Sequence, residues 1–172
     1  MRKVVLNKII NSYIEESKKA LDTFLEIDKL SILNASKLIV KAFKSGNKVL
    51  MCGNGGSASD AQHFAAELIG RFKKDRKSIT AISLNTDNSA ITAIGNDYDF
   101  SKIFSRQIEG LGRSGDILLL ITTSGNSKNL IEAAKAAKKK RIKVFCFSGN
   151  NGGKIKRYCK NVIKIQSNNT SL

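Results

Sequence analysis

The sequence contains no proline and no tryptophan, and it has one histidine and three cysteines among its 172 residues. Cys52, Cys146 and Cys159 are odd in number and widely spaced, which excludes a disulfide framework or a CxxC metal site and favours a reducing compartment. No apolar run approaches the roughly 18–20 residues of a membrane helix, and no apolar signal segment follows the amino terminus. We therefore expect a cytoplasmic protein without a membrane partner.

Acidic residues are also scarce, because 14 Asp and Glu stand against 30 Lys and Arg and leave a formal charge of +16. A basic balance of this size is compatible with nucleic acid, an anionic membrane surface or a phosphorylated substrate. The basic residues are scattered, with local clusters at 71–77 and 138–143, and the Lys-, Asn- and Ile-rich composition fits an AT-rich coding sequence. We therefore do not expect a nucleic-acid partner.

Apolar periodicity divides the chain into a helical part and an alternating part. Helical spacing from Val4 to Phe43 predicts two helices with a break near 28–31. After Ser45, strands are expected at 48–52, 79–84, 116–121, 143–147 and 162–165, and helical segments at 57–72, 89–94, 103–111, 129–140 and 152–159. This alternation predicts an α/β fold with a parallel five-stranded sheet. We expect one domain over residues 1–172, with the helical segment 1–45 packed on it.

Two strand ends carry loops that suit an anionic ligand. The first reads CGNGGS at 52–57, and its glycines let backbone N–H groups at a helix start approach a ligand closely. The second reads ITTSGNS at 121–127 and supplies four hydroxyls. Each loop alone is also ordinary turn and capping chemistry, and neither has the spacing of a nucleotide P-loop or a dinucleotide site. Because ligands of open α/β sheets bind beyond the carboxyl ends of the strands, the two loops together predict a site for a small phosphorylated ligand.

Two further clusters hold reactive or polar side chains. His63 and Glu67 are four residues apart on the expected helix, so they can chelate a metal, supply a general base or form an ordinary surface contact. Asn96 and Asp97 follow Gly95 at a helix end, where they either cap the helix or bind sugar hydroxyls.

Three segments carry a resemblance to a known family. CGNGGSASDAQHFAAELIGRF, AIGNDYDFSKIFSRQIEGLGRSGDILL and ITTSGNS resemble the phosphoheptose (sedoheptulose-7-phosphate) isomerases, which belong to the sugar isomerase (SIS) domain proteins. The resemblance implies a flavodoxin-like three-layer α/β sandwich with two amino-terminal helices, and a homotetramer. It also implies interconversion of sedoheptulose 7-phosphate and a glycero-manno-heptose 7-phosphate through an enediol, for bacterial surface polysaccharides.

The resemblance also assigns roles to individual residues. It implies that hydroxyl side chains hold the phosphate, that loop and helix-end residues bind the sugar, and that Glu67 is the base. His63 and Glu67 would supply half of a zinc site. The implied phosphate ligands are Ser57, Thr122, Thr123, Ser124 and Ser127, and the implied sugar ligands are Asn54, Gly55, Gly56, Glu67, Asn96 and Asp97.

One part of the family pattern is not found in the 172 residues. The family has a carboxyl-terminal helix with Gln-Glu-x-His and a further His, which supplies the catalytic acid and the other zinc ligands, whereas His63 is the one histidine here. We therefore expect a truncated isomerase with weak activity. Two alternatives stay open: a sugar-phosphate sensor, and a non-catalytic SIS protein similar to the regulator that binds the bacterial replication initiator, which Asn85-Thr86-Asp87-Asn88 also resembles.

Overall fold

The computed structural model describes residues 2–149, 151–167 and 169. Its sheet has the strand order β2-β1-β3-β4-β5, and every neighbouring pair is parallel. The strands are β1 (Val49–Gly53), β2 (Ala81–Ser83), β3 (Ile117–Thr122), β4 (Lys143–Gly149) and β5 (Asn161–Ile165). This order is that of the flavodoxin-like sandwich, so the predicted α/β fold and the expected strands are confirmed.

The helices connect and cover these strands. They are α1 (Arg2–Ile27), α2 (Lys29–Lys44), α3 (Gly56–Ile69), α4 (Asn88–Asp97), α5 (Ser105–Leu111) and α6 (Lys128–Lys139), with short 3₁₀ helices η1 (Phe100–Lys102) and η2 (Lys154–Arg157). The expected break between the first two helices falls at Asp28. The helix expected over 57–72 ends three residues early because Gly70 closes it, donating its N–H to the Ala66 carbonyl.

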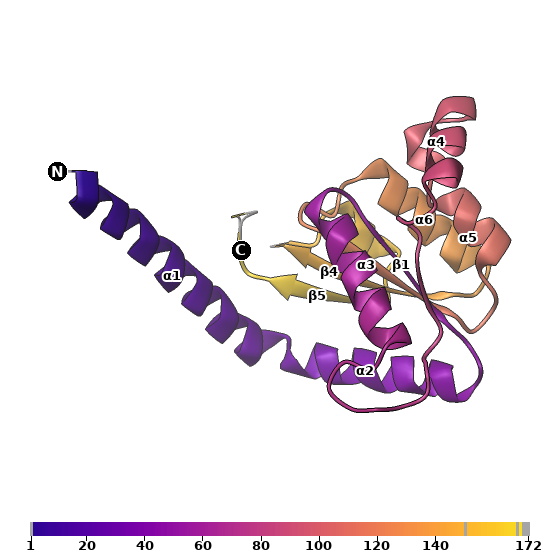
Figure 1. Cartoon of the computed structure of the whole chain (residues 1–172), viewed down its shortest axis with the longest axis horizontal. Coiled ribbons are helices and arrows are strands. Elements are labelled where there is room, and N and C mark those ends of the chain that lie inside the picture. The colour runs from indigo at the N-terminus through magenta and orange to yellow at the C-terminus, as the bar shows by residue number, and fades with distance from the viewer. Residues whose placement is uncertain (1, 150, 168, 170–172) are drawn as a thin grey trace.

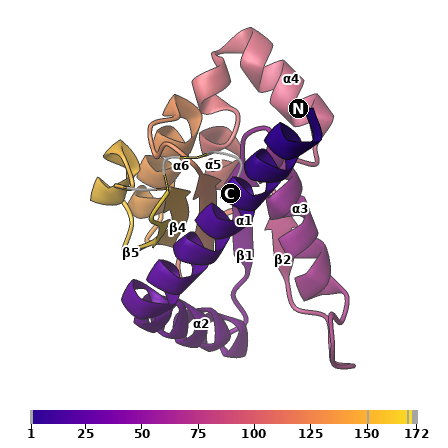
Figure 2. The ribbon, with the colours of Figure 1, turned by 90° about the vertical axis from the view of Figure 1, so that its left-hand side faces the viewer.

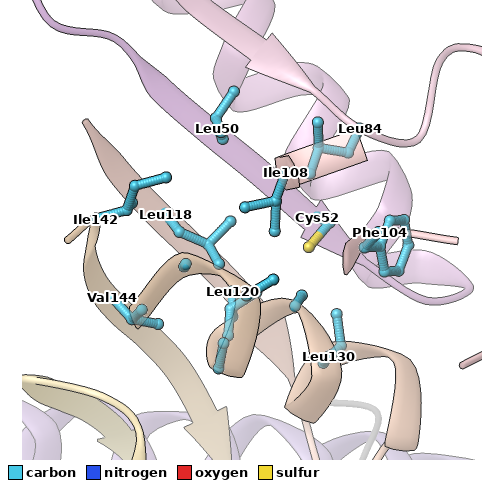
Figure 3. Packing of buried hydrophobic residues seen from close by; sticks show 14 of the residues in the cluster. Leu50, Cys52, Leu84, Phe104, Ile108, Leu118, Leu120, Leu130, Ile142 and Val144 are labelled. Carbon is cyan, nitrogen blue, oxygen red and sulfur yellow. The ribbon is translucent and has the colours of Figure 1, made fainter. Parts of the chain in front are cut away.

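Alternate residues of the central strands face two separate cores. On one face Leu50, Leu118 and Val144 pack under α5 and α6, as Figure 3 shows for the labelled side chains. On the other face Val49 and Leu119 pack against helical alanines of α2 and α3. The result is the predicted three-layer sandwich, with the strands buried on both sides.

The two amino-terminal helices differ in how they contact the sheet. Helix α2 buries Ala35 and Ala42 against it, whereas Ala20 is the one buried residue among the described side chains of α1. In Figure 1 α1 extends from the body of the molecule, and in Figure 2 it stands in front of the sheet. Within the segment 1–45, α2 supplies most of the residues that contact the core, and Phe24 of α1 packs against the same core. Most of the other apolar side chains of α1 are exposed, among them Ile10, Tyr13 and Leu21.

Candidate functional site

The two predicted loops meet at the carboxyl edge of the sheet. Strands β1 and β3 are neighbours, and Gly53 at the end of β1 pairs with Ile121. The helices that follow these strands lie on opposite faces, since α3 joins the core with α2 and α6 joins the core with α5. An open sheet binds its ligands at the point where successive connections diverge in this way.

A cavity of about 540 Å³ lies between the loops. The ends of β1, β3 and β4 line it, together with the start of α6 and the segment after β5. The lining residues are Asn54, Ser57, Ile121, Thr122, Thr123, Ser124, Asn126, Ser127, Leu130, Gly149, Asn151 and Ser167. None of these described residues carries a charged side chain, so a ligand here meets hydroxyls, amides and backbone groups.

In the loop after β3, two side-chain hydroxyls accept hydrogen bonds from backbone N–H groups of the same loop. The Gly125 N–H donates to Thr122 Oγ1 at 3.2 Å, and the Asn126 N–H donates to Ser124 Oγ at 3.2 Å. A hydroxyl that accepts from a backbone N–H keeps its own proton for another acceptor. The loop therefore offers O–H donors to a ligand that is rich in acceptor oxygens.

Two helices begin at the cavity. Ser57 stands in the first turn of α3 and Ser127 immediately precedes α6, and both line the cavity. The positive ends of helix dipoles and the unpaired N–H groups of first turns attract anions. Hydroxyl donors between two such helix starts form a site suited to a phosphate group.

Gly125 brings the loop after β3 against the turn that precedes η2. Its φ is +64°, and a Cβ at this position would stand 2.2 Å from the carbonyl oxygen of Gly152. The Gly125 carbonyl accepts from the Ile155 N–H at 2.9 Å. Only glycine fits this close approach, which fixes one wall of the cavity.

The cavity brings together six of the predicted site residues: Asn54, Ser57, Thr122, Thr123, Ser124 and Ser127. Gly55 and Gly56 lie in the same loop but are exposed and do not line the cavity. Asn96 and Asp97 lie at the end of α4, where Asn96 Nδ2 donates to Asp97 Oδ1 at 2.9 Å, also outside the cavity.

His63 and Glu67 lie apart from the hydroxyl cavity. They line a separate groove of about 670 Å³ together with Phe64, Leu68 and Phe72. Glu67 follows Ser57 by ten residues on α3, which corresponds to about 15 Å along the helix. The sequence placed these groups on one helix correctly, but the helix carries them away from the phosphate-type loops.

His63 and Glu67, the metal ligands that the sequence suggested, lie side by side on α3. His63 Nε2 lies 3.4 Å from Glu67 Oε1, and the His63 side chain is 75% exposed. Among the described residues no group of three or more His, Cys, Asp or Glu side chains could hold a metal ion. A zinc site needs three or four such ligands, so these residues do not form a complete one.

Several cavity residues were not predicted individually from the sequence. Asn126 stands within the recognised TSGNS segment, and its Oδ1 accepts from the Lys154 N–H at 3.1 Å. Gly149 ends β4 and Asn151 follows it, so the rule that ligands bind at strand carboxyl ends could have indicated both. Ser167 follows β5 and its hydroxyl donates to Glu16 of α1 at 3.4 Å, a long-range contact that no local pattern encodes.

The Asn85–Asn88 segment has a structural use in this chain. Asn85 exchanges two hydrogen bonds with the Gly53 backbone, Thr86 Oγ1 donates to the Ser83 carbonyl, and Asp87 caps α4 by accepting from the Ala90 N–H. These contacts give Asn85, Thr86 and Asp87 structural roles in the fold.

Two cysteines are buried, as the apolar strand patterns predicted. Burial raises the pKa of the Cys52 thiol, and a hydrogen bond with Cys159 together with burial raises that of Cys146. These thiols remain protonated at neutral pH and make poor nucleophiles.

Within the described residues, no helix is both long and apolar enough to cross a bilayer.

Comparison with known proteins places these features in a family. A family model described as the SIS domain matches residues 12–149. The phosphoheptose isomerase of Campylobacter concisus is 48% identical over 169 residues, which is 97% of this chain and 88% of the relative. That of Nitratiruptor is 47% identical over 94% of this chain and 86% of the relative. The expectation of a truncated isomerase gains no support from these matches.

Solved structures of phosphoheptose isomerases are similar to this chain as well. The phosphoheptose isomerase from Neisseria gonorrhoeae superposes with a TM-score of 0.90 at 41% identity, covering 96% of this chain and 89% of the other. The phosphoheptose isomerase from Francisella tularensis gives a TM-score of 0.92 at 39% identity, with coverage of 96% and 88%. The similarity therefore extends through sequence and fold alike.

Proposed function

Since the chain belongs to the phosphoheptose isomerase family of SIS-domain proteins, we propose that it interconverts sedoheptulose 7-phosphate and D-glycero-D-manno-heptose 7-phosphate through an enediol. The observation that carries this proposal in the structure is the uncharged, donor-rich cavity between the starts of α3 and α6. We propose that the reaction takes place in the cytoplasm and that its product supplies the heptose of surface polysaccharides.

The phosphate end of the substrate lies in this cavity. Ser57, Thr122, Thr123, Ser124 and Ser127 donate hydroxyl protons to the phosphate oxygens, and the two helix starts stabilise its charge. Asn54 stands on the wall beside Ser57 and binds the sugar. Gly55, Gly56, Asn96 and Asp97 are sugar ligands in the same proposal.

Glu67 is the proposed general base, which takes a proton from one of the carbons C1 and C2 and returns it to the other. We propose that a second copy of the chain brings its Glu67 to the sugar, because within one chain Glu67 lines a separate groove about 15 Å along α3 from Ser57. The exposed apolar side chains of α1, among them Ile10, Tyr13 and Leu21, provide the surface for such an assembly, which we propose to be a homotetramer.

Mixing two inactive variants tests the shared site. Glu67→Gln removes the base and Ser124→Ala weakens phosphate binding, so each homo-oligomer has low activity. After the two are unfolded together and refolded, a mixed oligomer contains sites with both residues intact only if they come from different chains. Recovered activity is expected, and no recovery would place Glu67 and the cavity of one chain in the same site.

The activity itself is tested in D₂O with sedoheptulose 7-phosphate. An enediol reaction introduces deuterium at the exchanging carbon and forms the aldose, both visible by NMR. Glu67→Gln is expected to lower kcat by about 10²–10⁴-fold, the usual contribution of a general base. If the folded protein neither converts the sugar phosphate nor exchanges its protons, the proposed function is wrong.

We also propose that His63 and Glu67 are two of the ligands of a zinc ion. Metal analysis of the oligomer purified with zinc, compared with His63→Ala, tests it. One zinc per chain that disappears in the variant supports the proposal, and equal zinc content in both contradicts it.

A further inference from the structure

A reciprocal amide pair joins the two loops of the cavity. Asn54 Nδ2 donates to Asn129 Oδ1 at 3.0 Å, and Asn129 Nδ2 donates to Asn54 Oδ1 at 2.8 Å. Asn129 lies in the first turn of α6 and is only 3% exposed. The pair connects residues 75 positions apart and holds the loop after β1 against the start of α6.

The backbone of α6 decides which way this pair is oriented. An asparagine amide can exchange its oxygen and nitrogen by a half-turn unless a neighbour distinguishes them. The Leu130 N–H donates to Asn129 Oδ1 at 3.0 Å, and a backbone N–H can only donate. Asn129 must therefore present its oxygen there, so the Asn54 amide can pair with it in only one orientation.

The backbone before Asn54 is held from the opposite side. The Gly53 N–H donates to Asn85 Oδ1 at 3.1 Å, and Asn85 Nδ2 donates to the Gly53 carbonyl at 2.9 Å. This side chain continues the β1–β2 ladder beyond Met51 and Ser83, the last paired residues. Asn54 thus has its backbone fixed through Asn85 and its side-chain amide fixed through Asn129.

After these bonds Asn54 keeps one N–H and one oxygen lone pair, and it lines the cavity. We propose that Asn129 is a positioning residue, which sets the Asn54 amide so that its remaining donor and acceptor meet the sugar. This inference rests on the proposed function for the identity of the ligand. It does not rest on it for the orientation of Asn54.

Two substitutions separate positioning from folding. Asn129→Asp keeps the size and the acceptor for Leu130 but places an oxygen against Asn54 Oδ1, whereas Asn129→Ala removes both bonds. Asn34→Ala, on an exposed position of α2, is the control for substituting an asparagine. The same Asn129 changes made together with Asn54→Ala show whether Asn129 acts through Asn54.

The kinetic readout distinguishes the sugar end from the phosphate end. Asn129→Asp is expected to lower kcat/KM for sedoheptulose 7-phosphate by about tenfold or more, because misplaced contacts act strongly on the rate. In Asn129→Ala, which brings no charge near the cavity, inhibition by inorganic phosphate should stay at the wild-type value, and combining this change with Asn54→Ala should add no further loss. The proposal would be overturned if kcat/KM stayed at the wild-type value, or if the affinity for phosphate fell by the same factor as kcat/KM. It would also be overturned if the double variant lost the product of the two single-variant factors.

A second readout needs no turnover. The Asn54 side-chain NH₂ signals, assigned by their absence in Asn54→Ala, should exchange slowly with solvent in the wild type and rapidly in Asn129→Ala, which removes the oxygen that accepts from Asn54 Nδ2. Unchanged slow exchange would overturn the positioning role, even if the protein fails to convert the sugar phosphate. Failure of the proposed function and failure of this inference are therefore distinguishable.

Discussion

The two edges of the sheet use polar groups in opposite ways. At the amino edge, the Asp116 carboxylate is 2% exposed and accepts from Lys48 Nζ at 2.6 Å. It also accepts from the Lys48 N–H at 3.0 Å and the Arg113 N–H at 2.8 Å. At the carboxyl edge, the cavity residues are uncharged, and Thr122 and Ser124 keep donors for a ligand.

The difference shows where stability and binding are located in this fold. A buried charge whose bonds are all made within the chain is costly to deprive of one partner, and it has nothing left for a ligand. Hydroxyls that accept internally and donate outward are inexpensive to leave open to water, because water serves as their partner until a ligand arrives. The comparison leads to four predictions.

The largest effect is expected at the amino edge. Asp116→Ala leaves the Lys48 ammonium and two backbone N–H groups without their acceptor, so the free energy of unfolding should fall by about 3–5 kcal/mol. Urea denaturation measures this change. Asp22→Ala, at an exposed position of α1, should change it by less than about 0.5 kcal/mol. Similar losses for both variants would contradict the contrast.

At the carboxyl edge the effect should fall on binding. Ser124→Ala removes a hydroxyl that donates to the proposed phosphate, which should weaken binding by about 1.5–3 kcal/mol, while stability changes little. Competition by inorganic phosphate measures the affinity, with Ser36→Ala on an exposed position of α2 as control. Full phosphate affinity in Ser124→Ala would remove Ser124 from the site.

Gly125→Ala tests the shape of the same edge. Its φ of +64° and the 2.2 Å approach to the Gly152 carbonyl force the loop to move, at a cost of about 1–3 kcal/mol in unfolding free energy. Phosphate affinity should fall as well. Gly110→Ala, in α5 with open space around it, should leave both quantities unchanged or slightly raise stability.

The smallest effect concerns a surface cluster away from both edges. Hydrogen bonds from Lys135 and Lys102 lower the pKa of the Glu132 carboxyl below its ordinary value. A lowered folded-state pKa means that the stabilisation is present above the unfolded pKa and disappears as pH falls through the folded one. Glu132→Gln should thus cost at most about 1 kcal/mol at pH 7 and progressively less below about pH 4.

Thermal or urea unfolding across this pH range measures the Glu132 effect. Glu26→Gln, on the exposed surface of α1, is the matched control. A Glu132→Gln effect that grows as the pH falls would contradict the assigned direction.

Much of the fold could be predicted from the sequence because its signals are local. The apolar run at 116–121 and the glycine-rich loop at 52–57 each indicate a strand or its end within a few residues. Parallel pairing then places both loops at one edge. The sequence alone therefore predicts that their hydroxyls belong to one site.

The residues that sequence reasoning missed depend on contacts over long distances. Asn129 looks like an ordinary first-turn residue, and its partner is 75 positions away. Ser57 and Glu67 belong to one predicted helix, and the helical rise between them places Glu67 in a groove apart from the cavity. The apolar pattern of α1 predicts a helix, but it does not identify the surface against which the helix packs.

The uncharged cavity has a kinetic consequence in a chain of formal charge +16. The overall field accelerates the approach of a phosphate ester, and this attraction is screened beyond about 8 Å at physiological ionic strength. Once bound, the ester is held by short-range hydrogen bonds that salt hardly weakens. Added salt should therefore slow association and leave the residence time nearly unchanged, so that capture and retention are governed by different parts of the molecule.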